Sequence, residues 1–238
     1  MAAHGANLAS DKAANYTNAS WTSGSNEGSG FGAWSFSQNA GGGAGDSGHF
    51  LGDSGEGDPS FALFSGGNDG AFLSSADRPF TGGALTAGQT FEIDLGHSAL
   101  IDDTNPGDVG INLTDSGATG TDVVFTLKFV GGTTNWIIND GGSDFNINQG
   151  FAANTSIAFS FTYEGGSNYS YTFGTASGSN FTANNTISGI DGFRLFTNNQ
   201  GGGENFGADN PAIVPEPSSC ALLFGVAGLT LAMIRRRR

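Results

Sequence analysis

The feature that most constrains this sequence is a pair of alternating runs in its second half. In "SIAFSFTY", bulky apolar side chains fill every second position from Ile157 to Phe161, and in "NYSYTF" aromatic rings do so from Tyr169 to Phe173. A period of two places such residues on one face of a β-strand. The glycines of the intervening "EGGS" allow the positive φ of a tight connection. The two runs therefore predict an antiparallel hairpin.

Short runs of the same kind, separated by Gly, Asn and Asp, extend over most of the chain. With 41 glycines, long helices are disfavoured, because each glycine in a helix interior costs about 1 kcal/mol relative to alanine. The stretch "DVVFTLKFVGGTTNWIIND" predicts a second hairpin around Gly131 and Gly132. In all, we predict strands at Ala33–Ser37, Phe61–Ser65, Ala71–Ser74, Thr90–Leu95, Val109–Thr114, Asp122–Val130, Asn135–Asn139, Ser156–Tyr163, Asn168–Phe173 and Ile190–Phe196.

About ten strands without a helical segment favour an all-β protein. We predict a two-sheet antiparallel β-sandwich, jelly-roll-like, with a closed barrel as the alternative. The 20 phenylalanines supply an aromatic core between the sheets. The expected organisation is a loosely ordered arm at 1–20, the sandwich at 21–200, a linker at 201–217, a transmembrane helix at 218–234 and a basic stub at 235–238.

The charge of the chain is strongly asymmetric. Before Pro215 there are 21 acidic residues and four basic ones, Lys12, Arg78, Lys128 and Arg194. Nucleic acid is therefore excluded as a partner, since its binding needs a basic surface. An acidic body suits cations or neutral polymers such as polysaccharides. The one cysteine, Cys220, permits no disulfide within the chain.

The C-terminus differs from everything before it. Ser218–Ile234 is an apolar run of 17 residues without a charge, followed by Arg235, Arg236, Arg237 and Arg238. As a helix it would be about 25 Å long, which is short but sufficient for a bilayer. Basic residues after a span mark the cytoplasmic side, which would leave the β-domain outside. The alternative is a buried C-terminal helix of the domain.

This tail resembles the PEP-CTERM sorting signal of Gram-negative bacteria. The motif Val214, Pro215, Glu216 and Pro217 comes first, then the apolar helix, then the arginines. The resemblance implies that the protein is exported, held in the inner membrane and processed by an exosortase. Its destination would be the cell surface or the exopolysaccharide matrix. The resemblance also implies a secretory signal, which "MAAHGANLASDKAANYT" does not show, so we expect one to be encoded upstream of Met1.

The body, too, resembles the Gly- and Asn-rich β-sandwiches that accompany such tails, which have no assigned biochemical activity. The stretches "RPFTGGALTAGQTFEIDL" and "ISGIDGFRLFTNNQGGG" carry this resemblance. We therefore expect a structural or adhesive role in the exopolysaccharide layer. The alternative function is that of a carbohydrate-binding module at the cell surface.

The strand "FEIDLGH" is the one candidate for catalysis. It resembles the Glu-x-Asp-x-x-Glu strand of laminarinase-like glucanases, in which paired carboxylates cleave the glycosidic bond. Glu92 and Asp94 fit this pattern, but His97 occupies the third position, where the proton donor is required. We therefore predict that the chain is not an enzyme, with a divergent glycoside hydrolase as the third hypothesis.

Two further candidate sites concern ligands. The oxygen-rich loop "IDDTNPGDVG" places Asp102, Asp103, Asn105 and Asp108 close together, a set that could hold calcium, although such residues also simply form turns. "INDGGSD", with Asp140 and Asp144, is a weaker case. Apart from calcium, no cofactor is expected. Trp136 is the candidate for stacking on a sugar, alongside Trp21, Trp34, Tyr16, Tyr163, Tyr169 and Tyr171, and the alternative is that these rings belong to the core.

Overall fold

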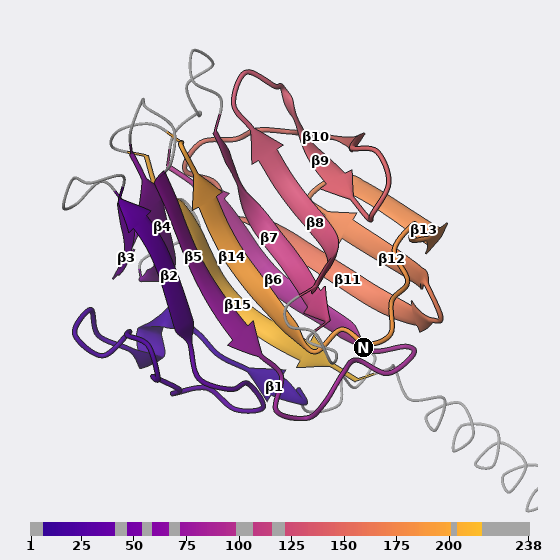
Figure 1. The fold of residues 1–238 in the computed structure, drawn as a ribbon, viewed down its shortest axis with the longest axis horizontal. Coiled ribbons are helices and arrows are strands. Elements are labelled where there is room, and N and C mark those ends of the chain that lie inside the picture. Colours follow the sequence, from indigo (N-terminus) through magenta and orange to yellow (C-terminus); the bar gives the residue numbers. More distant parts are fainter. Residues whose placement is uncertain are drawn as a thin grey trace, which may run out of the picture.

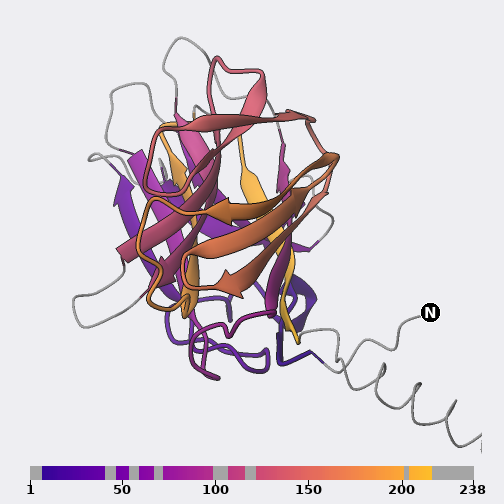
Figure 2. The same cartoon turned by 90° about the vertical axis from the view of Figure 1, so that its right-hand side faces the viewer.

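The computed structural model is an all-β protein made of two antiparallel sheets packed face to face. It describes residues 7–40, 47–53, 59–66, 72–98, 107–115, 122–200 and 204–215. Figure 1 shows the two layers, and Figure 2 looks onto the end where β10, β12 and β13 lie. The predicted two-sheet sandwich is confirmed.

The first sheet has its strands in an order that runs from the β13 edge to the β3 edge. They are β13 (Ala176–Thr182), β12 (Asn168–Phe173), β11 (Ile157–Gly165), β6 (Thr90–His97), β15 (Phe206–Val214), β4 (Ser60–Ser65) and β3 (Ser47–Gly52), with the short β1 (Ala9–Ser10) also paired to β15.

The second sheet covers the first, and its edges are β10 and β2. In order, its strands are β10 (Phe145–Gly150), β9 (Asn135–Asn139), β8 (Asp122–Val130), β7 (Asp108–Asp115), β14 (Gly192–Asn198), β5 (Phe72–Pro79) and β2 (Ser35–Ala40). The one described helix is a short 3-10 turn, η1 (Ala13–Asn15).

The alternating runs form the hairpin that their pattern predicts. β11 pairs with β12 so that Phe161 lies opposite Tyr171, and on its other side Phe161 lies opposite Phe91 of β6. All three rings are buried, because every second residue of these strands faces the second sheet. The β8–β9 hairpin around Gly131 and Gly132 is confirmed as well, with Gly132 at a φ of 75°.

Aromatic stacks lie where the edge strands of the two sheets meet. At one edge the ring of Phe36 in β2 stacks on His49 in β3, with centroids 3.8 Å apart. At the other, Phe145 in β10 stacks on Phe181 in β13 at 5.8 Å. These contacts join the sheets at both sides and shield the core from water.

The prediction of a loosely ordered arm at 1–20 is wrong for its described part, 7–20. β1 pairs with β15, and Ala9, Ala13 and Tyr16 are buried. The reason is electrostatic: Arg78 of β5 is fully buried and its guanidinium contacts the equally buried carboxylate of Asp11. A buried cation needs such a partner, so the ion pair ties the N-terminal segment to the sandwich.

The prediction of a linker at 201–217 is also corrected. Phe206–Val214 forms β15, a strand inside the first sheet between β6 and β4. Its alternation is interrupted by a β-bulge between Asp209 and Ala212, with Asn210 at a φ of 54° and Pro211 next to it. Bulges of this kind disrupt the period of two, which concealed the strand in the sequence.

No helix in the described part of the chain combines the length and apolar character of a membrane span. The helix predicted at 218–234 and the arginines 235–238 lie outside the described residues.

Candidate functional site

The outer face of the first sheet carries mostly short polar side chains. On β11 and β12, the buried aromatic rings alternate with Ser160, Thr162, Ser170 and Thr172, which point away from the core. Three hollows on this face share lining residues with their neighbours and cross the strands from β13 to β1. We call these three neighbouring hollows together the trough.

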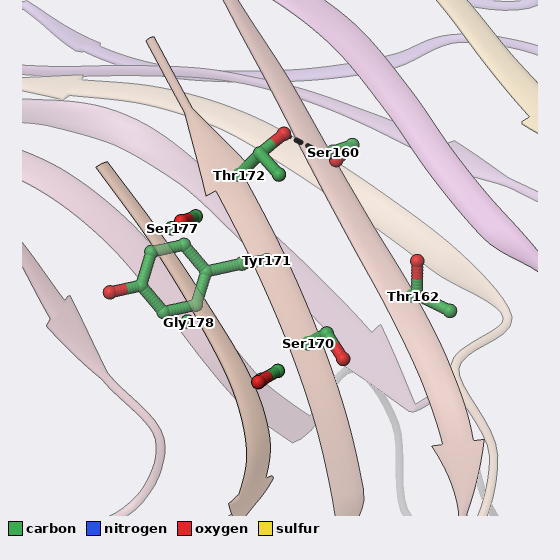
Figure 3. Close-up of a pocket in the computed structure, with 8 residues that line it drawn as sticks. Ser160, Thr162, Ser170, Tyr171, Thr172, Ser177 and Gly178 are labelled. Atoms are coloured by element: carbon green, nitrogen blue, oxygen red, sulfur yellow. Dashed lines mark hydrogen bonds between the residues drawn. The ribbon is translucent and has the colours of Figure 1, made fainter. Parts of the chain in front are cut away.

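The first hollow, of about 320 Å³, lies over β11, β12 and β13. Figure 3 shows hydroxyl groups from all three strands around it. Ser160 Oγ and Thr172 Oγ1 are hydrogen-bonded across the β11–β12 pair at 2.7 Å. Tyr171 also lines the hollow, beside Gly178 of β13, but its ring is directed into the core and the residue is 6% exposed. A Cβ at Gly178 would lie 2.8 Å from Cε1 of Tyr171, so glycine leaves this ring its space.

The second hollow, of about 290 Å³, continues over β6 and β15 and shares Ser160 and Thr172 with the first. Glu92 and Asp94 of β6 line it from the same strand. Asn210 of the β15 bulge donates a hydrogen bond from Nδ2 to Asp94 Oδ2 at 3.0 Å. The middle of the trough is thus acidic.

The third hollow, of about 320 Å³, lies where the N-terminal segment meets β15 and shares Asn210 with the second. Lys12 and Asn15 line it, together with the buried Asp11. The packing of this segment against β15, rather than any feature of β15 alone, forms this end of the trough.

A further carboxylate lies next to the acidic middle. Asp209 of β15 lies opposite Asp94 in the strand register, and its Oδ1 accepts a hydrogen bond from the backbone N–H of Ala13 at 2.8 Å. Burial raises the pKa of the Asp209 carboxyl, and the charges of Asp94 and Asp11 add to the rise. The field around this part of the trough therefore disfavours additional negative charge.

Only two of the three candidate catalytic residues of β6 face the trough. Glu92 and Asp94 face outward and line one hollow, as the alternation predicts. His97 instead faces the interior, where it is 1% exposed and its Nε2 lies 3.1 Å from Gln200 Oε1. It therefore cannot act on a molecule bound beside Glu92.

Trp136 does not provide a surface for a sugar, so that prediction is wrong. The ring is 2% exposed and packs between Phe129 and Phe173, at centroid distances of 5.8 and 4.8 Å. Trp21 and Trp34 are equally buried. Of the aromatic candidates, Tyr171 is the one that lines the trough. The sequence does not distinguish it from Tyr169, because both occupy inward positions of the same strand.

The candidate calcium loop lies largely outside the described residues, since Asp102, Asp103 and Asn105 are not among them. Asp108 begins β7, where burial raises the pKa of its carboxyl while a hydrogen bond with Asn198 opposes the rise. Asp140 is buried and accepts hydrogen bonds from Tyr169 Oη and Asn184 Nδ2. No three acidic, histidine or cysteine side chains are gathered for a metal in the part of the chain that is described.

Of the tail motif, Val214 is the last residue of β15 and Pro215 follows it. Glu216 and Pro217 lie outside the described residues.

No family model and no curated protein matches the sequence. Solved structures share the fold. A sialidase chain aligns with a TM-score of 0.57 and 9% identity over 76% of this chain, which spans only 17% of the sialidase. A chain solved in connection with endo-acting O-glycanases of the human gut microbiota has a TM-score of 0.51 and 10% identity, over 87% of this chain and 92% of that one. A galectin of Caenorhabditis elegans aligns at 0.40, with 17% identity, over 57% of this chain and 88% of the galectin.

These comparisons correct the prediction that the chain is not an enzyme. A similar sandwich occurs in chains whose names include a sialidase and O-glycanases. At such low identity the likeness shows the fold alone. Because the same fold occurs in enzymes, it gives no reason to exclude enzymatic activity.

Proposed function

We propose that this protein is a carbohydrate-binding β-sandwich that holds a glycan in the trough of the first sheet. The observation that carries the proposal is the row of hydroxyl, amide and carboxylate groups that lines three connected hollows. Sugars present many hydroxyl groups, each of which both donates and accepts hydrogen bonds, and the trough offers matching groups.

The solved structures of similar fold support a carbohydrate-related role by analogy. Of the three structures described above, the two with a TM-score above 0.5 belong to a sialidase and to work on O-glycanases. Analogy of fold does not assign a ligand, so the proposal depends on the trough itself.

The test is a glycan panel measured by calorimetry with a variant that fills the trough. Ser160 is shared by the first two hollows, so Ser160→Trp should abolish binding. Thr126→Trp is the matched control, because Thr126 is a half-buried hydroxyl on the outer face of the second sheet. Both variants are first checked for an unchanged unfolding transition. If no glycan in the panel binds the unmodified protein, the proposal is wrong.

A second candidate function is glycan hydrolysis at the acidic middle of the trough. Glu92 and Asp94 line the same hollow two positions apart on β6. Residues two apart on a strand point to the same side, so both carboxyl groups face the same hollow, as the pair of carboxyl groups of a glycosidase must. This function requires release of reducing ends from a bound glycan by the unmodified protein and loss of that release in Glu92→Gln.

We further propose that the C-terminal tail addresses the protein to the cell surface through an exosortase and the inner membrane. The order of motif, apolar run and arginines supports this proposal, as does the end of β15 at Val214, directly before Pro215. In the native host, Pro215→Ala/Pro217→Ala should leave the protein in the inner membrane. Unchanged delivery to the surface would contradict the sorting proposal without affecting the proposed glycan binding.

A further inference from the structure

The trough is open along its length and crosses strands rather than following them. Its lining residues come from β13, β12, β11, β6 and β15 in spatial order. At about 4.8 Å between neighbouring strands, these five strands span roughly 19 Å. A single monosaccharide fills only part of that length, so the shape suits several consecutive sugar units.

The charged side chains in the middle of the trough are acidic. Glu92 and Asp94 line the second hollow. At the other side, Glu164 accepts a hydrogen bond from Ser170, which lines the first hollow. Among the described residues that line the three hollows, Lys12 is the one basic side chain, and it lies at the β1 end.

The other cations of the described body are held elsewhere. Arg78 is buried against Asp11. Lys128 of β8 forms an ion pair with Asp144, in the loop between β9 and β10. Arg194 of β14 forms one with Asp77 of β5. A polymer with a carboxylate on each sugar would therefore meet repulsion along most of the trough, whereas amino groups would be attracted to its walls.

We infer that the trough binds the interior of a polysaccharide chain that carries free amino groups, in preference to a neutral or a uronic-acid chain. This inference rests on the proposed glycan binding and specifies its ligand. The hydroxyl groups contact the sugar rings, and the carboxylates of Glu92 and Asp94 select the charge. Because the two ends of the trough are open, chain ends are not required for binding.

The experiment compares three hexasaccharides at pH 5.5, where primary amines are charged. They are a hexamer of glucosamine, the same hexamer fully N-acetylated, and a hexamer of a uronic acid. We expect the glucosamine hexamer to bind roughly fivefold or more tighter than the acetylated one at low salt, as expected for charges a few ångströms apart in water. Added salt should reduce this preference.

Variants distinguish selection in the trough from general attraction to an acidic protein. Glu92→Gln/Asp94→Asn should remove the preference for glucosamine, so that the amino and acetylated hexamers bind the variant equally. Asp144→Asn, which removes a charge near the second sheet, should leave the preference as it is. A disaccharide should bind much more weakly than the hexamer, and a bulky group on the reducing end should not weaken binding.

Each outcome decides between the two proposals. Equal binding of the amino and acetylated hexamers, or tighter binding of the uronic acid, overturns the charge selection while leaving glycan binding in place. Glucosamine binding that persists in Ser160→Trp identifies adsorption outside the trough and also overturns the inference. If no hexamer binds, the inference is overturned. The proposed glycan binding is then overturned as well only if no member of the glycan panel binds.

Discussion

The outer faces of the two sheets differ in the length and the pairing of their side chains. On the first sheet, short hydroxyls such as Ser160 and Thr172 leave the trough above the strands. On the second sheet, Arg194 Nε and Asp77 Oδ1 are 2.6 Å apart, and Lys128 Nζ and Asp144 Oδ2 are 2.9 Å apart. The cations of the second face are thus paired within the protein, and the carboxylates of Glu92 and Asp94 line an open hollow. A hollow of about 310 Å³ also lies on the second sheet, but it is lined by the paired Asp77 and Arg194, and the proposed ligand site is therefore assigned to the first sheet.

The largest expected effect comes from breaking the buried Asp11–Arg78 ion pair, compared with the partly exposed Lys128–Asp144 pair of the second sheet. Asp11→Ala leaves Arg78 as a buried, unpaired charge and should lower the free energy of unfolding by about 3–5 kcal/mol. Asp144→Ala breaks a partly exposed pair and should cost at most about 1 kcal/mol. Denaturant unfolding measures both. Equal losses would show that the N-terminal segment is not anchored by its buried charge.

A smaller effect is expected from removing paired hydroxyls. Ser160→Ala/Thr172→Ala removes a hydrogen-bonded pair from the trough, and glycan binding should weaken by about 1–2 kcal/mol, the net worth of one or two hydrogen bonds. Asn112→Ala/Thr126→Ala removes a pair of similar geometry, 2.8 Å apart, from the second sheet and should not affect binding. Calorimetric titration checks both. An equal loss in the two variants would contradict the assignment of the site to one face.

The smallest effect is the opposite pH dependence of two carboxylates. Burial raises the pKa of Asp209, so its ionised form destabilises the folded state, and this cost appears as the pH rises through the folded-state pKa. The hydrogen bond from Asn139 and then Lys128 lower the pKa of Asp144, so its ionised form stabilises the fold, and this contribution is lost as the pH falls through the folded-state pKa.

Asp209→Asn should therefore increase, and Asp144→Asn decrease, the free energy of unfolding at pH 7, each by less than about 1 kcal/mol. Both differences should disappear well below pH 4, where the unmodified carboxyls are protonated. Unfolding curves at pH 3, 5 and 7 measure them. A change of the same sign in both variants would show that the two carboxylates do not differ in environment as described.

The accuracy of the sequence predictions followed the regularity of each strand. The bounds of β8, β9 and β12 agree with the prediction, because β9 and β12 alternate without interruption and β8 does so from Phe125 on, beyond its bulge at Val124. β13 was missed because "ASGSNFT" has few apolar residues and lies at an edge, half or fully exposed. β15 was missed because its bulge and Pro211 break the period, and β1, β3 and β10 are short or rich in Gly and Asn.

The candidate site was predictable in part. The outward positions of Glu92 and Asp94 follow from the alternation of β6 alone. Their neighbours in the trough do not, because Ser160, Thr172 and Asn210 come from strands far apart in the sequence. Trp136 was misassigned because a strand's alternation does not tell which face becomes the core when both carry large residues, as Trp136 and Ile137 do.

The sequence by itself determined the regularly alternating strands, two of their hairpins, the aromatic core and the acidic charge, because each depends on local periodicity or on composition. It also contains the tail motif in full. The tertiary structure decided that Asp11 is drawn to the buried Arg78 and that β15 lies between β6 and β4. The pairing of β1 with β15 brings the N-terminal segment beside the bulge, and it places Asn210 and Lys12 at one end of the trough. Strand order is set by burial and charge pairing over the whole molecule, which no local pattern contains.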